Sequence, residues 1–194
     1  MLINLEGIDG CGKSTQSQFL MDEFEKNNEK TILLKEPTNG KYGRKLWEML
    51  SGKIEATTEE ILELFVMDRK EHVDQKINPA LNEGKIVLMD RYYYSTMAYQ
   101  AAAGIDVKRI RKDNEFAPKP DIVLVFDLPA DLAMKRVRGH SVADVFEKEE
   151  HLEKVRKAYL NLEDDSLVRI IDATRTPEEI FDEVWKLISE VRNG

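Results

Sequence analysis

The chain has 194 residues, and its 29 basic and 37 acidic side chains give a formal net charge of −8 with neutral histidines. Charged residues make up 34% and hydrophobic residues 42%, which is typical of globular proteins rather than of disordered or membrane-embedded ones. This length predicts a single domain over residues 1–194. Proteins that coat nucleic acid carry a basic face, so the acidic balance predicts no nucleic-acid polymer as partner.

Nothing in the sequence indicates export or membrane insertion. No apolar run approaches the roughly 20 residues that a membrane-spanning helix needs. The first residues have neither the basic region nor the small-residue cleavage site of a secretory signal. The single cysteine, Cys11, cannot form an internal disulfide, which suits a reducing compartment. We therefore expect a cytoplasmic protein without a membrane partner.

Short apolar runs alternate with longer helical patterns from end to end. Strands are expected at 2–6, 30–35, 86–89, 123–126 and 167–171. Helices are expected at 13–28, 40–51 (broken), from an N-cap at 57 towards 79–84, at 147–162 and at 178–191. Such hydrophobic strands, joined by helix-length crossovers, predict an α/β fold with a parallel five-stranded sheet flanked by helices. Ligands of such sheets bind at the carboxyl ends of the strands.

The first strand is followed by a phosphate-binding motif. The segment Gly7-Ile8-Asp9-Gly10-Cys11-Gly12-Lys13-Ser14 matches G-x-x-x-x-G-K-[ST] and opens the first predicted helix. Its backbone N–H groups can surround phosphate oxygens, Lys13 can reach the β- and γ-phosphates, and the Ser14 hydroxyl can bind Mg²⁺. The motif therefore predicts a nucleoside triphosphate with Mg²⁺. The predicted ATP-binding residues are Gly7, Ile8, Asp9, Gly10, Cys11, Gly12, Lys13, Ser14 and Thr15.

A second polar group ends the strand at 86–89. Asp90 can orient Mg²⁺ or its water shell, and Arg91 can clamp a phosphate with two hydrogen bonds. At helical spacing Arg91, Ser95 and Tyr99 fall on one face, so we expect Tyr99 to contact a ligand. The metal ligands predicted from the sequence are thus Ser14 and Asp90, directly or through water.

In the long helix, Phe65 and Arg69 are four residues apart and share a face. The pair can stack on a base ring and hydrogen-bond its edge. The alternative is an aromatic side chain in the core with the arginine stem covering it.

Together these residues resemble the thymidylate kinase family over nearly the whole chain. The matching pieces are residues 6–16, the Lys35-Glu36-Pro37 turn, residues 65–69, Asp90-Arg91-Tyr92 through Ser95 to Ala98-Tyr99-Gln100, and Asp172-Ala173-Thr174. The resemblance implies a P-loop NTPase-type three-layer sandwich with a short lid. It implies a homodimer that transfers the γ-phosphoryl of ATP to dTMP, giving dTDP and ADP for dTTP synthesis.

The same resemblance assigns roles to substrate-binding residues. Asp9 would hold the sugar 3′-hydroxyl, and Tyr99 would crowd the 2′ position to favour deoxyribose. Phe65 would stack on thymine and Arg69 would bond its O4. Arg91 would grip the acceptor phosphate.

The chain departs from the family pattern in its placement of positive charge. Gly10 stands where many members have a P-loop arginine, and Asp144-Val145 stands where others have an Asp-Arg pair late in the lid. The lid is expected at about 136–147, so Arg136, with Arg138 second and Lys135 as a further alternative, is predicted to reach the transferred phosphate. The predicted catalytic residues are Lys13, Arg91, Arg136 and Arg138. The altered turn after Glu36 leaves Lys35 or Arg44 as further candidates for the acceptor phosphate.

Three other functions remain open at this point. A kinase of a different nucleoside monophosphate would use the same phosphate clamps. A GTP-dependent switch is disfavoured because the chain has no Asn-Lys-x-Asp tetrad. A nucleic-acid-associated ATPase is disfavoured by the acidic charge.

Overall fold

The computed structural model describes residues 1–136, 142–162 and 165–193, with the backbone alone for 142–148. The strands are β1 (Leu2–Glu6), β2 (Thr31–Lys35), β3 (Ile86–Asp90), β4 (Ile122–Asp127) and β5 (Val168–Asp172). The helices are α1 (Lys13–Lys26), α2 (Lys41–Leu50), α3 (Thr58–His72), the π-helix η1 (Val73–Ile77), α4 (Asn78–Asn82), α5 (Tyr93–Ala102), α6 (Val107–Asp113), α7 (Ala130–Arg136), α8 (Val142–Leu160) and α9 (Pro177–Asn193). No helix in these ranges is long and apolar enough to cross a membrane.

The five strands form one parallel sheet in the order β2-β3-β1-β4-β5. Every residue of the inner strands β1 and β3 is buried, as are the first five of β4, which explains their uninterrupted apolar sequences. The edge strands β2 and β5 are only partly buried. The expected parallel five-stranded sheet is confirmed.

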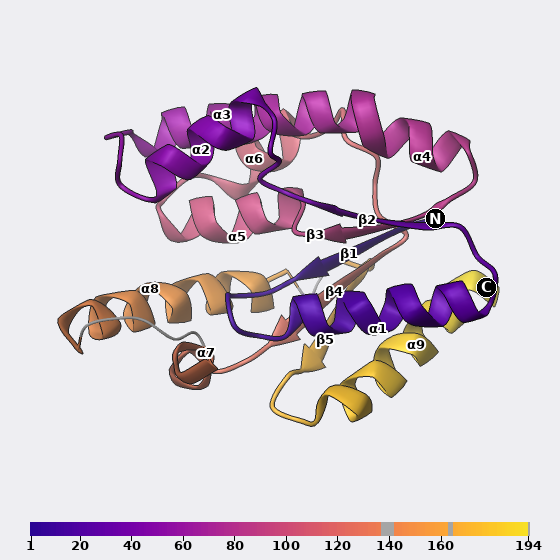
Figure 1. Cartoon of the computed structure of the whole chain (residues 1–194). Helices are drawn as coiled ribbons and strands as arrows, with labels where there is room; N and C mark the ends of the chain where they lie inside the picture. Colours follow the sequence, from indigo (N-terminus) through magenta and orange to yellow (C-terminus); the bar gives the residue numbers. More distant parts are fainter. Residues whose placement is uncertain (137–141, 163–164, 194) are drawn as a thin grey trace.

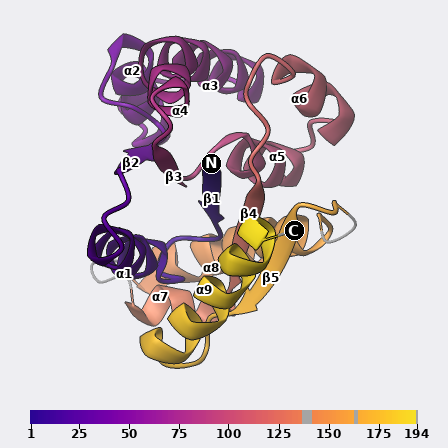
Figure 2. The same cartoon turned by 90° about the vertical axis from the view of Figure 1, so that its right-hand side faces the viewer.

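Helices cover both faces of this sheet (Figures 1 and 2). Helices α1 and α9 pack against each other and against the sheet on one side. The opposite side carries α4, α5 and α8, with α3 packed on α5 and α2 packed on α3. The expected three-layer sandwich is confirmed, and the carboxyl ends of all five strands open onto one edge of the molecule (Figure 1).

Two helix boundaries differ from the sequence-based expectation. The long helix does start at a capping box, in which the Glu60 amide donates to Thr57 Oγ1 and the Thr57 amide to Glu60 Oε2. It does not continue as one α-helix, however, because the π-helical turn η1 separates α3 from α4. Pro79 lacks an amide hydrogen and its ring crowds the preceding turn, which accounts for the wider turn just before it.

The second difference concerns the helix expected at 147–162. Helix α8 already begins at Val142, so the latter part of the predicted lid is helical. Acidic residues close to this new start favour a helix N-terminus, a signal that the sequence-based boundary overlooked. The lid residues 137–141 lie outside the described part of the chain.

Helix α5 has no N-cap side chain of its own. Its cap comes from Glu6 at the end of β1, whose Oε1 accepts from the amides of Tyr92 (2.7 Å) and Ser95 (3.2 Å). The other carboxylate oxygen accepts from Ser95 Oγ (2.6 Å) and Tyr159 OH (2.9 Å). A carboxylate at a helix N-terminus is favoured by the helix dipole, so Glu6 fixes where α5 starts relative to the sheet.

This buried carboxyl predicts a pH-dependent stability. Burial raises the pKa of Glu6 above its ordinary value of 4.5, although Arg91 and the hydrogen bonds oppose the shift. The folded chain therefore holds this proton more tightly than the unfolded chain. As the pH rises from about 4.5 through the folded pKa, the stabilisation that the protonated Glu6 contributes is lost, and the free energy of unfolding falls. In Glu6→Gln this contribution is absent, so the difference in unfolding free energy, wild type minus variant, should shrink over that range.

Urea unfolding of both proteins at a series of pH values measures this difference. Substitution of the exposed Glu25 by Gln provides the control and should leave the pH dependence close to that of the wild type. A wild-type-minus-Glu6→Gln difference that stays constant from pH 4 to about 8 would contradict a raised pKa at Glu6.

Candidate active site

An open cleft of about 600 Å³ lies at the carboxyl ends of the strands. Its floor is the loop between β1 and α1, and its walls come from the ends of β2 and β3 and from segments near α7 and α9. The lining residues are Asp9, Gly10, Cys11, Gly12, Lys13, Ser14, Thr15, Gln16, Lys35, Asp90, Arg91, Arg136, Arg175, Pro177 and Ile180. Most of the predicted site residues are therefore brought together in one cleft.

The loop from Gly7 to Gly12 depends on glycines at its two ends. Gly7 has φ +132°, and a Cβ there would lie 2.6 Å from the Phe126 carbonyl oxygen of the neighbouring strand. Gly12 has φ +105° and directly precedes α1. Gly7 and Ile8 are not in the cleft lining, so the structure does not bring these two predicted ATP-binding residues to the cleft.

The Lys13 ammonium is almost completely buried. It donates to the backbone carbonyls of Gly7 and Ile8, both at 3.0 Å, and lies 3.7 Å from Cys11 Sγ. Burial of the ammonium, reinforced by nearby Arg91, lowers the pKa of Lys13. The Lys13 ammonium is nevertheless suited to bind a phosphate anion, because a phosphate carries the negative charge that the neutral backbone carbonyls lack.

Arg91 lies at the centre of the cleft wall. It donates to Asp9 Oδ1 (2.6 Å), to Ser95 Oγ (3.0 Å) and to Tyr99 OH (3.4 Å). Arg91, Ser95 and Tyr99 do lie together, but the helical-spacing argument for this was wrong, and neither Ser95 nor Tyr99 is in the cleft lining. Arg91 precedes α5 and has φ +71°, so a left-handed turn rather than a shared helix face brings it over the helix.

Asp9 is the acidic partner of this cationic group. The cleft walls desolvate its carboxyl and oppose its charge, but Arg91 and then Lys13 outweigh that effect, and the pKa of Asp9 lies below its ordinary value. Asp9 is therefore ionised at neutral pH and can accept a hydrogen bond from a ligand hydroxyl.

Asp90 fits the requirements of a cation ligand. Its Oδ2 pairs with Lys35 Nζ at 3.1 Å, whereas its Oδ1 is buried without a hydrogen-bond partner among the described residues. Ser14, at the start of α1, presents an exposed side chain to the same cleft. The described residues contain no group of three or more His, Cys, Asp or Glu able to hold a metal on their own. A hard cation such as Mg²⁺ would thus need phosphate oxygens and water to complete its shell.

Lys35 and Arg44, the two further candidates for binding the acceptor phosphate, differ in position. Lys35 lines the cleft beside Asp90. Arg44 is not in the lining, and its guanidinium donates to the carbonyl of Asn39. Of the two, Lys35 is the cation within reach of a ligand in the cleft.

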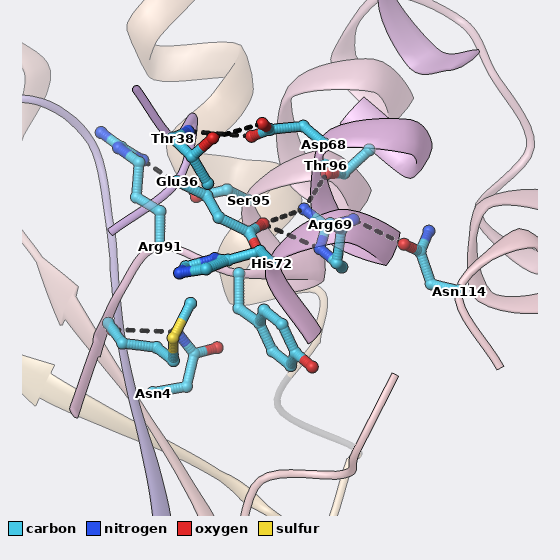
Figure 3. Close-up of polar contacts among 12 residues, drawn as sticks. Asn4, Glu36, Thr38, Asp68, Arg69, His72, Arg91, Ser95, Thr96 and Asn114 are labelled. Carbon is cyan, nitrogen blue, oxygen red and sulfur yellow. Dashed lines mark hydrogen bonds and ion pairs between the residues drawn. The ribbon is translucent and has the colours of Figure 1, made fainter. Parts of the chain in front are cut away.

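Arg69 lies deeper than the sequence suggested, with 1% of its surface exposed. Its guanidinium contacts Glu36, Thr96 and Asn114, and it lies over the ring of Tyr92 at 5.4 Å (Figure 3). Phe65, one turn earlier in α3, is half-buried. The guanidinium is enclosed rather than extended towards solvent, so the alternative of an arginine stem covering a core aromatic does not describe it.

Arg136 lines the cleft as predicted, and its Nη2 donates to the Ala173 carbonyl at 3.4 Å. Two other residues of the cleft lining, Arg175 and Gln16, were not predicted from the sequence. Arg175 pairs with Glu183. The position of Arg175 just after β5, a strand ending at the same edge of the sheet, was the signal that could have found it. Arg138 lies outside the described residues.

Comparison with known proteins identifies the family to which this sequence is similar. A family model described as thymidylate kinase matches residues 5–184. The chain is similar to a probable thymidylate kinase of Archaeoglobus fulgidus, with 42% identity over 194 residues that cover all of this chain and 97% of that protein. It is similar to a thymidylate kinase of Desulfotalea psychrophila, with 46% identity covering 83% of this chain and 81% of that protein. A thymidylate kinase of Xanthomonas oryzae is 38% identical over 97% of this chain and 82% of its own length.

Proposed function

The chain belongs to the thymidylate kinase family, and from that premise we propose how its residues share the transfer of the γ-phosphoryl group of ATP to dTMP. The chain is an ATP:dTMP phosphotransferase. The observation that carries the residue assignment is the position of Arg91 in the same cleft as the Lys13 loop. Two phosphate-binding cations in one cleft allow a donor and an acceptor phosphate to meet in line.

The donor triphosphate would bind to the loop at residues 7–15. Backbone N–H groups and the N-terminus of α1 favour phosphate oxygens there, and Lys13 would exchange its carbonyl acceptors for the β- and γ-phosphates. Mg²⁺ would be held by Ser14 and Asp90, directly or through water, with phosphate oxygens in the rest of its shell. When bound, the ion neutralises charge on the transferred phosphoryl group.

The acceptor would occupy the side of the cleft around Arg91. The guanidinium would bind the dTMP phosphate while Ser95 and Tyr99 hold its orientation. The ionised Asp9 would accept from the sugar 3′-hydroxyl, and the ring of Tyr99 would restrict space beside the 2′ carbon. Lys35 would add a second positive charge near the acceptor phosphate.

The base would lie against the half-buried Phe65, with Arg69 donating to O4 of thymine. Thymine also carries a donor at N3 that requires an acceptor in a buried site. Gln100 has a buried amide oxygen without a described partner and lies one turn beyond Thr96 on α5, so it is a suitable acceptor. These contacts would select a pyrimidine with a keto group.

The third source of positive charge is the predicted lid. Arg136 ends α7 and lines the cleft. Closure of the lid over the triphosphate would bring Arg136 to the transferred phosphoryl group, and Arg138 is the second candidate for this role. Exclusion of water by the same closure would limit hydrolysis of ATP.

We further infer a cytoplasmic homodimer. The lone buried cysteine suits a reducing compartment. Large apolar side chains are exposed on β2 and α2, and Leu33 and Trp47 line one groove there. Exposed apolar surface of this kind marks an interface, and a second copy of the chain is the partner proposed for it.

Release of ADP, measured with a panel of nucleoside monophosphates, tests the acceptor. We expect the highest kcat/KM with dTMP and loss of activity when Mg²⁺ is chelated. A higher kcat/KM with dUMP or dCMP would overturn the choice of dTMP. Steady ADP release without any acceptor would favour an ATPase instead.

The lid assignment predicts a large kinetic effect at Arg136. Arg136→Ala should lower kcat by about 10³, because loss of a transition-state arginine has that order of effect. Arg109→Ala is the matched control, since Arg109 is exposed on α6, pairs with Glu59 and Asp113, and is not in the cleft lining. Its kcat should stay within about threefold of the wild type. A decrease below about tenfold in Arg136→Ala would move the role away from this residue.

The proposed dimer predicts that Trp47→Glu yields a monomer, because a charge at the interface cannot be buried without a partner. Sedimentation velocity at several concentrations measures the change in mass. Val191→Glu, at an exposed apolar position on α9, should leave the wild-type mass unchanged. A wild-type chain that sediments as a monomer at all concentrations would refute the dimer.

A further inference from the structure

A buried polar cluster surrounds Arg69 (Figure 3). Glu36, just after β2, accepts on Oε2 from Arg69 Nε (2.8 Å) and Nη2 (2.7 Å). Its other oxygen lies 3.1 Å from His72 Nδ1. Glu36 and Arg69 are only 2% and 1% exposed, so this pair holds its geometry away from solvent.

Two further residues complete the cluster. Thr96 Oγ1 accepts from Arg69 Nη2 at 3.1 Å, and Asn114 Oδ1 accepts from Nη1. Asn114 follows the short helix α6, and its Nδ2 donates to the Ile110 carbonyl at 2.7 Å. This second bond fixes which end of the amide faces Arg69, because a carbonyl can only accept.

The donors of the guanidinium can be counted against these acceptors. An arginine has five N–H groups, one on Nε and two on each terminal nitrogen. The described contacts occupy the Nε hydrogen, both hydrogens of Nη2 and one of Nη1. One N–H of Nη1 is therefore left for a substrate, and its direction is set by the acceptors on the other four.

We propose that Asn114 is a positioning residue that sets base selectivity through Arg69, an inference that rests on the proposed role of Arg69 in binding O4. Asn114 holds Nη1 so that its second N–H points at the base. A single fixed N–H donates to a keto oxygen at position 4 of the pyrimidine. An amino group at that position would instead face this N–H with its own donors, which is unfavourable in a buried site. Asn114 itself would not touch the substrate.

The test compares dTMP with 5-methyl-dCMP, which keeps the methyl group and replaces O4 by an amino group. In Asn114→Ala the ratio of kcat/KM for these two acceptors should fall by about tenfold or more, through a higher KM for dTMP. The KM for ATP and the kcat with dTMP should stay within about threefold. Asn114→Asp retains an acceptor for Nη1 but loses the donor to Ile110, so it should keep most of the wild-type ratio.

Several controls keep the result interpretable. Asn114→Leu is close in volume and provides a second variant if Asn114→Ala is poorly folded, and thermal unfolding checks both. Asn82→Ala, at an exposed position in α4, should leave all parameters unchanged. Equal changes in the KM for ATP and in the kcat for every acceptor would mean a merely structural role and overturn the proposal.

Arg69→Lys separates this proposal from the one it rests on. If Arg69→Lys loses the selectivity while Asn114→Ala and Asn114→Leu keep it, Arg69 reads the base and the role of Asn114 is refuted. If Arg69→Lys keeps the wild-type selectivity, the role of Arg69 in binding O4 fails first, and that of Asn114 falls with it.

Discussion

The hydrogen bonds that converge on the buried carboxylate of Glu6 join three segments that are far apart in the chain. They link the end of β1 to the first turn of α5, through Tyr92 and Ser95, and to α8, through Tyr159. Ser95 also accepts from Arg91, so the same carboxylate controls where the central arginine of the cleft lies. Desolvation of a carboxylate is costly, and the converging donors are what make its burial tolerable.

Local features of this protein were predictable from sequence because their causes are local. The loop ending in Lys13 is defined by glycine spacing, and the inner strands are defined by unbroken apolar runs. The cap that Glu6 supplies to α5 comes from 86 residues away, and no short-range pattern indicates it. Arg91 was placed near Tyr99 for the wrong reason, since an arginine gives no indication of a left-handed backbone conformation, unlike the glycine or asparagine that favour it. Contacts such as Asn114 with Arg69 depend on the tertiary packing of α6.

The acidic composition and the cationic cleft are compatible because three of the five cations in the cleft lining have an acidic neighbour. Arg91 pairs with Asp9, Lys35 with Asp90, and Arg175 with Glu183. The cations are thereby held in fixed positions without a large local excess of positive charge. A small anion with several oxygens can still bind, because guanidinium and ammonium groups have donors beyond those that the carboxylates use.

The contacts of Lys13 with its own loop bear on the energetics of turnover. Because the carbonyls of Gly7 and Ile8 already hold the ammonium, the loop keeps its curvature without help from a phosphate. In the proposed binding mode, a phosphate would replace these carbonyls as acceptors, and little conformational entropy would be lost. The same exchange would run backwards at release, since the two carbonyls could again accept from the ammonium once the product leaves. The buried ammonium would then have acceptors both before and after each turnover.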